Sequence, residues 1–198
     1  EEFLTWAEEI DIPAVTAWVL SRENLSRPSE ELEPYFDVLI ELFGRLPNLA
    51  RRHDMAIRFI GSLDLLPHEV VRAAKDAEEA RPSGGRRLNI AMGYGGRQEI
   101  VDAARDLVAD LVREGVAPEE ISNRIDADGL AQHMYSADLP DPDLLIRTSG
   151  ESRLSGFLLW QSAYAEFVFV DVYWPAFRRV DFLRAVRDFS LRERRFGR

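Results

Sequence analysis

The chain has 198 residues, a formal net charge of −10 and no cysteine. A chain of this length buries roughly 70% of its unfolded surface, which suits one domain with a sizeable core. The absence of cysteine excludes disulfides, thiolate zinc sites and cysteine nucleophiles, and it fits a reducing compartment such as the cytoplasm. The acidic balance argues against a general nucleic-acid binder, which needs a basic face. No apolar run approaches the ~18 residues of a membrane span.

The first predicted element is a partial helix, because Phe3, Leu4, Ala7 and Ile10 lie at helical spacing from the start. A domain rarely begins inside an amphipathic helix, so we expect the natural protein to start further upstream. The next elements are, in chain order, a strand at 14–20, a polar loop at 21–28, a helix to about residue 46 that Pro34 restarts or kinks, a strand at 55–61 and a helix at 67–80.

The second half of the chain continues the alternation. A strand is predicted at 88–94, and the clearest helix follows at 97–115 with Gly115 as its stop. The remaining elements are two short helices near 118–125 and 127–135, strands at 143–147 and 166–174, and a closing helix at 179–194. This order predicts a single α/β domain with a mainly parallel central sheet and helices on both faces.

Three polar stretches follow predicted strands, at 21–28, 93–97 and 147–156. In parallel α/β sheets, ligands bind beyond the carboxyl ends of the strands. The glycines of the second stretch, "GYGGR", do not have the spacing of a dinucleotide-binding fingerprint. We therefore expect these stretches to form a site for an anionic ligand other than a dinucleotide.

The third stretch, "RTSGESRLSG", is the strongest candidate for binding phosphate. The guanidinium groups of Arg147 and Arg153 match phosphate oxygens in bidentate geometry, and the Ser155 hydroxyl adds a donor. The alternative is a solvated turn whose arginines pair with surface carboxylates. Glu151 lies between the two arginines and is placed to neutralise either one.

Glu166 begins a strand a short distance after this turn. A carboxylate beside bound phosphate would repel it unless a divalent cation lay between them, and Mg²⁺ typically uses one or two carboxylates together with substrate phosphates. The alternative is that Glu166 pairs with an arginine. In the first stretch, Ser21, Asn24 and Arg27 are either further site residues or ordinary loop residues leading into a helix.

The block "DPDLLIRTSGESRLSGFLLWQSAYAEFVFVDVYWPAF" strongly resembles the signature region of the cis-prenyltransferases, the undecaprenyl diphosphate synthase family. "LSRENLSRP" resembles the serine–glutamate–asparagine loop of that family, "GYGGR" its glycine–arginine turn, and "RRFG" its Arg-x-Gly ending. The resemblance covers nearly the whole chain, and it is greatest to actinobacterial short-chain Z-prenyl diphosphate synthases.

The resemblance implies a Mg²⁺-dependent condensation of isopentenyl diphosphate with an allylic diphosphate, which leaves a Z (cis) double bond. It implies that isopentenyl diphosphate is held by Arg147, Arg153 and Ser155, and that Glu166 helps to bind Mg²⁺. The apolar run after the turn would line a tunnel for the growing chain.

The resemblance also assigns the remaining site residues. Ser21 and Asn24 would lie beside the reacting ends of the substrates, and Arg27 would contact the allylic diphosphate. Because the family is dimeric, Arg195 and Gly197 would complete the site of a neighbouring subunit.

Two departures from the family pattern stand out. The aspartate–glycine–asparagine motif, with its metal-binding aspartate, belongs upstream of residue 1, together with an N-terminal strand. We therefore expect residues 1–198 to be a domain that lacks both. Leu25 stands where long-chain members usually carry tryptophan, and Val19 stands where they often carry a smaller side chain. A bulkier tunnel wall would stop elongation early, which favours a short product.

Three alternatives stay open. The chain could be a long-chain undecaprenyl or decaprenyl diphosphate synthase, or a non-catalytic partner subunit of the same family. An unrelated nucleotide- or phosphate-binding module has only the α/β pattern in its favour. A lipid-making enzyme could associate peripherally with a membrane, although no segment requires this.

Overall fold

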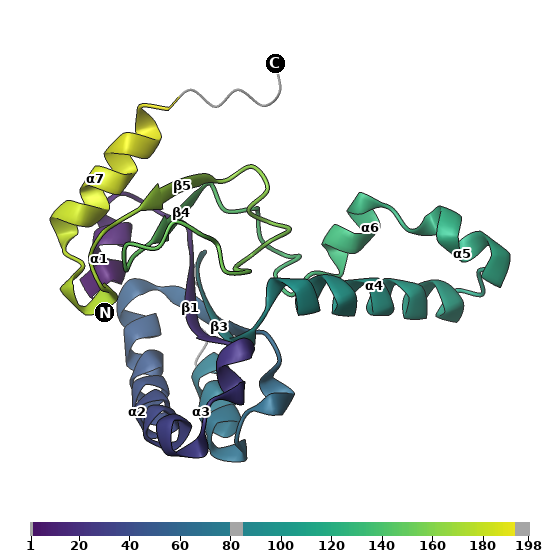
Figure 1. Cartoon of the computed structure of the whole chain (residues 1–198), viewed down its shortest axis with the longest axis horizontal. Helices are drawn as coiled ribbons and strands as arrows, with labels where there is room; N and C mark the ends of the chain where they lie inside the picture. Colours follow the sequence, from purple (N-terminus) through teal and green to yellow (C-terminus); the bar gives the residue numbers. More distant parts are fainter. Residues whose placement is uncertain (1, 80–84, 193–198) are drawn as a thin grey trace. The chain divides into compact units, whose positions relative to one another are not determined.

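A computed structural model of the chain describes residues 2–79 and 85–192 (Figure 1). The chain divides into two compact units, residues 1–95 and residues 96–198. We call them the first unit and the second unit.

The first unit contains a three-stranded parallel sheet. Its strands are β1 (Ala14–Ser21), β2 (Met55–Ile60) and β3 (Arg86–Tyr94), in the order β1-β3-β2. From Leu88 onward every residue of β3 is buried, as expected for a strand with neighbours on both sides and apolar contacts on both faces. Because the three strands are parallel, their carboxyl ends meet at one edge of the sheet.

Three α-helices accompany this sheet: α1 (Glu2–Glu9), α2 (Ser29–His53) and α3 (His68–Glu79). Short 3₁₀ helices, Glu23–Ser26 and Leu63–Leu65, follow β1 and β2. Helices α2 and α3 lie side by side in Figure 1 and contribute to one apolar core with β2 and β3. This core is centred on the edge-to-face pair of Phe43 and Phe59, whose ring centroids are 4.7 Å apart.

Helix α2 is longer than the sequence predicted. It continues through both Pro34 and Pro47 and ends at His53, and the C-cap residue Asp54 takes the left-handed conformation with φ 49°. A proline removes one helical hydrogen bond, but the residues after Pro47 still carry a buried face, including Leu49 and Ala50. Burial of that face against the core offsets the lost bond, so the helix does not stop near residue 46.

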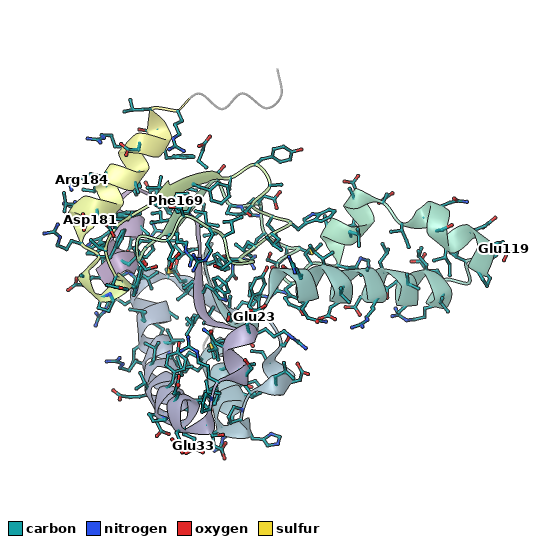
Figure 2. The ribbon with its side chains drawn as sticks, in the orientation of Figure 1. Glu23, Glu33, Glu119, Phe169, Asp181 and Arg184 are labelled. Atoms are coloured by element: carbon teal, nitrogen blue, oxygen red, sulfur yellow. The ribbon has the colours of Figure 1, made fainter. Side chains whose placement is uncertain are left out.

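The second unit contains a two-stranded parallel sheet, with β4 (Leu144–Arg147) paired to β5 (Glu166–Phe169). The first and longest helix of the unit is α4 (Gly96–Arg113), and the carboxyl-terminal helix α7 (Arg179–Ser190) contacts β5. Figure 2 labels Asp181 and Arg184 on α7, whose charged groups are 3.7 Å apart. The shorter helices are α5 (Pro118–Arg124), α6 (Ala127–Gln132) and the 3₁₀ turn Trp174–Ala176.

Strand β5 is shorter than the predicted strand at 166–174. The backbone carbonyls of Val170 and Val172 accept hydrogen bonds from Gly150 and Ser149, at 3.2 and 2.6 Å. These two carbonyls therefore bind the turn after β4. Because they do not pair with β4 in the regular strand pattern, β5 ends at Phe169. The apolar alternation of the segment extends further than its strand pairing.

Every strand pair in the described residues is parallel, and helices alternate with strands along the chain. The predicted parallel α/β class is thus confirmed, with the strands arranged in two separate sheets. The assignment of residues 1–198 to a single domain stays a prediction. Among the helices within residues 2–79 and 85–192, none is both long enough and apolar enough to cross a bilayer.

Candidate functional site

The carboxyl edge of the first unit's sheet carries the first group of predicted site residues. Ser21 is the last residue of β1, and its Oγ accepts a hydrogen bond from the backbone N–H of Asn24 at 3.1 Å. The backbone N–H of Arg27 in turn donates to the carbonyl of Asn24. We call residues 21–27 the strand-end loop. The structure thus brings Ser21 and Asn24 together, while their role in a substrate site stays a prediction.

A cavity of about 220 Å³ opens beside the strand-end loop. Its polar residues are Asn24, Arg27 and Glu31, and the rest of its wall is formed by Val19, Leu20, Leu32 and Tyr35. Arg27 and Glu31 form an ion pair of 3.9 Å, and both side chains are more than half exposed. Such exposed pairs are weak, so Arg27 is readily available to an anionic ligand. The cavity is therefore lined by both charged and apolar side chains.

The two predicted tunnel residues lie in different places. Val19 lines the cavity. Leu25 is absent from the cavity lining: it packs against the core, and a methyl group built on Gly93 would lie 3.5 Å from its Cδ1. Leu25 therefore packs the strand-end loop against the core, and it is not among the residues that line the cavity.

Tyr35 is a cavity residue that the sequence analysis missed. Its hydroxyl donates a hydrogen bond of 2.6 Å to the backbone carbonyl of Val19, which fixes the ring from α2 against β1. Burial raises the pKa of Tyr35, an effect that the charge of Arg27 opposes. The hydroxyl is thus kept as a neutral donor. In the sequence, Tyr35 is recognisable only as an aromatic residue on the apolar face of α2, which does not distinguish a cavity residue from a core residue.

The turn after β4 in the second unit carries the next group. Arg147 ends β4, and Ser149 and Gly150 both have positive φ, at 77° and 69°. A methyl group at Gly150 would lie 2.7 Å from Oδ1 of Asp171, so this position requires glycine. Ser155 also has positive φ, 50°. The turn is therefore a tightly specified backbone and not a loose connection.

The two arginines of this turn differ in their surroundings. Arg153 pairs with Glu151, the neighbour that the sequence placed between the arginines. The Nε of Arg147 is buried, and no acceptor for it lies within residues 2–79 and 85–192. A buried donor without an acceptor costs free energy. The Nε of Arg147 thus lacks a hydrogen-bond acceptor among the described residues, whereas Arg153 has a carboxylate partner within the turn.

Glu166 begins β5, and its Oε2 accepts a hydrogen bond of 2.6 Å from Nη1 of Arg192. The alternative interpretation of Glu166 as half of an ion pair therefore describes this structure. The partner lies 26 residues along the chain, and the sequence alone did not identify it. Arg195 and Gly197 lie outside the described residues.

The residues that the structure describes contain no group of three acidic or histidine side chains placed to hold a metal ion. A cation bound at Glu166 would thus depend on oxygen atoms from other sources. Substrate phosphates are the usual source for Mg²⁺. Glu166 fits this donor set, because only one of its two carboxylate oxygens is engaged by Arg192.

Comparison with known sequences identifies the chain's relatives. Residues 1–197 match the sequence model of the undecaprenyl diphosphate synthase family. The chain is 51% identical over 199 residues to the (2Z,6E)-farnesyl diphosphate synthase of Thermobifida fusca, covering 99% of this chain and 76% of that protein. It is also 51% identical over 201 residues to the tritrans,polycis-undecaprenyl-diphosphate synthase (geranylgeranyl-diphosphate specific) of Methanopyrus kandleri, covering 100% of this chain and 73% of that protein.

Comparison with solved structures gives the same answer for the fold. The chain matches the crystal structure of lavandulyl diphosphate synthase from Lavandula x intermedia, in complex with dimethylallyl diphosphate, with a TM-score of 0.90. The two sequences are 32% identical, and the match covers 98% of this chain and 83% of the other. Together with the match over nearly all of its length, this shows that the chain belongs to the undecaprenyl diphosphate synthase family of cis-prenyltransferases.

Proposed function

We propose that this protein condenses isopentenyl diphosphate with an allylic diphosphate to form a short Z-prenyl diphosphate. The allylic carbon–oxygen bond breaks and releases diphosphate, the double bond of isopentenyl diphosphate attacks the freed carbon, and loss of a proton leaves the new double bond. The observation that best supports this proposal is the cavity beside the strand-end loop. Its lining combines Asn24, Arg27 and Glu31 with apolar side chains, which supports a ligand with a diphosphate head and a hydrocarbon tail if Arg27 leaves its ion pair with Glu31.

In this proposal, Arg147, Arg153 and Ser155 hold the diphosphate of isopentenyl diphosphate, and Arg27 contacts the allylic diphosphate. The buried Nε of Arg147 supports its part, because a bound oxygen would supply the missing acceptor. Arg153 is 66% exposed in its pair with Glu151, so exchange of that carboxylate for a diphosphate costs little. Ser21 and Asn24 would lie beside the reacting carbons.

We propose Mg²⁺ as the metal, held by Glu166 and diphosphate oxygens. The bound ion would neutralise charge that develops on the leaving diphosphate. Glu166 supplies the hard anionic oxygen that Mg²⁺ prefers. Arg192 occupies one of the two carboxylate oxygens, so it competes with the ion for Glu166.

One feature supports a short product. Val19, a larger residue than long-chain members often carry here, forms part of the wall. The alternative of a long-chain product is kept open by the equal identity to a farnesyl and an undecaprenyl synthase. A non-catalytic subunit is disfavoured because Arg147, Arg153 and Glu166 are all present.

We further propose a homodimer in which Arg195 and Gly197 complete the partner's site. Large aromatic and apolar side chains on the second unit support this assembly: Tyr164, Tyr173, Trp174 and Leu191 are each more than half exposed. Tyrosine and tryptophan are enriched at protein interfaces. The cytoplasm is the proposed location, since the chain has no cysteine and the family resemblance suggests at most peripheral contact with a membrane.

A condensation assay with isopentenyl diphosphate and several allylic primers tests the function. We expect Z-prenyl diphosphates to form, and Arg153→Ala to raise KM for isopentenyl diphosphate by about tenfold, as for loss of a charged hydrogen bond. Arg113→Ala is the matched control, since Arg113 is similarly exposed and also pairs with a nearby carboxylate. An unchanged KM in Arg153→Ala would remove that residue from the site.

Thermal melting of the same protein distinguishes the proposed enzyme from an unrelated nucleotide-binding module. Prenyl diphosphates should raise the melting temperature of the wild-type protein, whereas nucleotides should not. The opposite pattern, without any condensation product, would support a nucleotide-binding module.

A further inference from the structure

One contact at the carboxyl edge of the first unit joins strands that are not neighbours. Nη1 of Arg22 donates a hydrogen bond of 2.7 Å to Oγ of Ser62. Arg22 follows β1 and Ser62 lies just beyond β2, while β3 lies between these two strands in the sheet. The side chain therefore spans the end of β3. Ser62 is 7% exposed, so the contact is shielded from competing water.

Two glycines at the end of β3, Gly93 and Gly95, lie close to the residues of this contact. A methyl group on Gly95 would lie 3.4 Å from Cβ and 3.8 Å from Cδ of Arg22. Gly93 has φ 55°, and a methyl group there would lie 2.9 Å from the carbonyl oxygen of Ser62. A side chain at Gly93 would thus crowd the backbone of Ser62, whereas a methyl group at Gly95 would make ordinary van der Waals contact with Arg22. The stem of Arg22 therefore lies close to the backbone of Gly95.

The guanidinium of Arg22 is engaged by a hydroxyl and not by an acid. Among residues 2–79 and 85–192, Arg22 forms no ion pair, and Ser62 is the acceptor of its side chain. Glu23, labelled in Figure 2, faces the turn instead, with Oε1 3.5 Å from a methyl group built on Gly95. The contact is therefore a hydrogen bond to a neutral hydroxyl, and its effect on the loop is to fix the position of the Arg22 side chain.

The backbone of the strand-end loop depends on Arg22 at two further points. The N–H of Arg22 donates to the carbonyl of Tyr94, and its carbonyl accepts from the N–H of Leu25. Asn24 lies inside the turn that this second bond closes, and its N–H donates to Ser21 Oγ. A fixed Arg22 side chain therefore limits the movement of the residues on both sides of it.

We infer that Arg22 is a positioning residue, whose contact with Ser62 holds the strand-end loop, and with it Asn24 and Arg27, in place. This inference rests on the proposed function, because that function is what makes Asn24 and Arg27 substrate-facing. It assigns Arg22 no contact with substrate. The consequence is a specific kinetic signature, since only the ligand handled by the loop should be affected.

Amide hydrogen exchange tests the inference without activity. In Arg22→Met, which keeps the apolar stem and loses the donors, the amides of Asn24, Leu25 and Arg27 should exchange about tenfold faster than in the wild-type protein. Arg86→Met is the matched control. It breaks the contacts of Arg86 with Glu8 and Asp11 at the opposite end of β3, and it should leave these amides unchanged.

Kinetics then test the consequence. Arg22→Met and Ser62→Ala should each lower kcat by about tenfold and raise KM for the allylic diphosphate, with KM for isopentenyl diphosphate within about twofold of wild type. The double variant should be no worse than the poorer single one, because both remove one contact. Added guanidinium ion should restore part of the activity of Arg22→Met and none of that of Arg86→Met.

The outcomes separate cleanly. Unchanged exchange of the loop amides in Arg22→Met overturns the inference, whether or not the protein is active. Additive losses in the double variant, or equal losses in Arg86→Met, also overturn it and reduce Arg22 to a general contribution to stability. A wild-type protein that forms no prenyl product overturns the proposed function instead, while the exchange measurement still decides the role of Arg22.

Discussion

Arg192 and Mg²⁺ compete for Glu166 in the proposed site, and this competition has a measurable size. Nη1 of Arg192 lies 2.6 Å from Oε2 of Glu166, with the two side chains 46% and 28% exposed. Ion pairs with this degree of exposure contribute about 0.2–1 kcal/mol. Removing the pair should therefore tighten Mg²⁺ binding by about 1.4- to 5-fold. Arg192→Gln is the change that tests this.

The assay is the initial rate of condensation as a function of Mg²⁺ concentration at saturating substrates. Arg192→Gln should reach half of its maximal rate at a lower Mg²⁺ concentration than the wild-type protein. Arg187→Gln is the control, because Arg187 lies on the preceding helix and pairs with Asp188. Glu166→Gln should lose rate by orders of magnitude at every Mg²⁺ concentration.

A higher Mg²⁺ requirement in Arg192→Gln would refute the reasoning. It would mean that Arg192 orients the carboxylate for the ion and does not compete with it. Full activity of Glu166→Gln would remove Glu166 from the metal site altogether.

Three further predictions follow from the two units. Val19→Ala enlarges the cavity wall and should lengthen the main product by at least one isoprene unit, measured by mass spectrometry; an identical product would exclude Val19 as a determinant of length. The pKa of His133 is raised from 6.5 by its hydrogen bond to the carbonyl of Gly129 and by Asp110. The stability that it contributes is complete below pH 6.5 and lost as pH rises through the raised value, so His133→Gln should flatten the fall in melting temperature as pH rises above about 6.5. Gly150→Ala forces a side chain into positive φ beside a carboxylate, and chemical denaturation should show a loss of about 1–2 kcal/mol; wild-type stability would contradict the assigned backbone.

The sequence predicted the elements of the fold well where one pattern dominated. The apolar strand runs and the amphipathic helix after Gly95 correspond closely to β1, β2, β3 and α4. The pattern failed where tertiary contacts overrode it. Helix α2 passes Pro47 because its later face is buried, and β5 ends at Phe169 because the carbonyls beyond it hold another turn.

The sequence suggested which residues could form a site, but it did not identify most of the contacts that these residues make in the structure. Ser21 and Asn24 are three residues apart, so their meeting was accessible to local reasoning. The partners Arg192 and Glu166, and likewise Arg22 and Ser62, are 26 and 40 residues apart, and only the fold joins them. The role of Leu25 in a tunnel stays a prediction, since Leu25 lies outside the lining of the described cavity.

The geometry of the newly formed double bond tests the central claim most directly. Isopentenyl diphosphate labelled at the reacting carbons would be incubated with an allylic primer and Mg²⁺, and the product examined by nuclear magnetic resonance. The account predicts a Z double bond at each newly added unit, in a chain released after few additions. A new bond of E geometry, or intact labelled substrate after prolonged incubation, would contradict it.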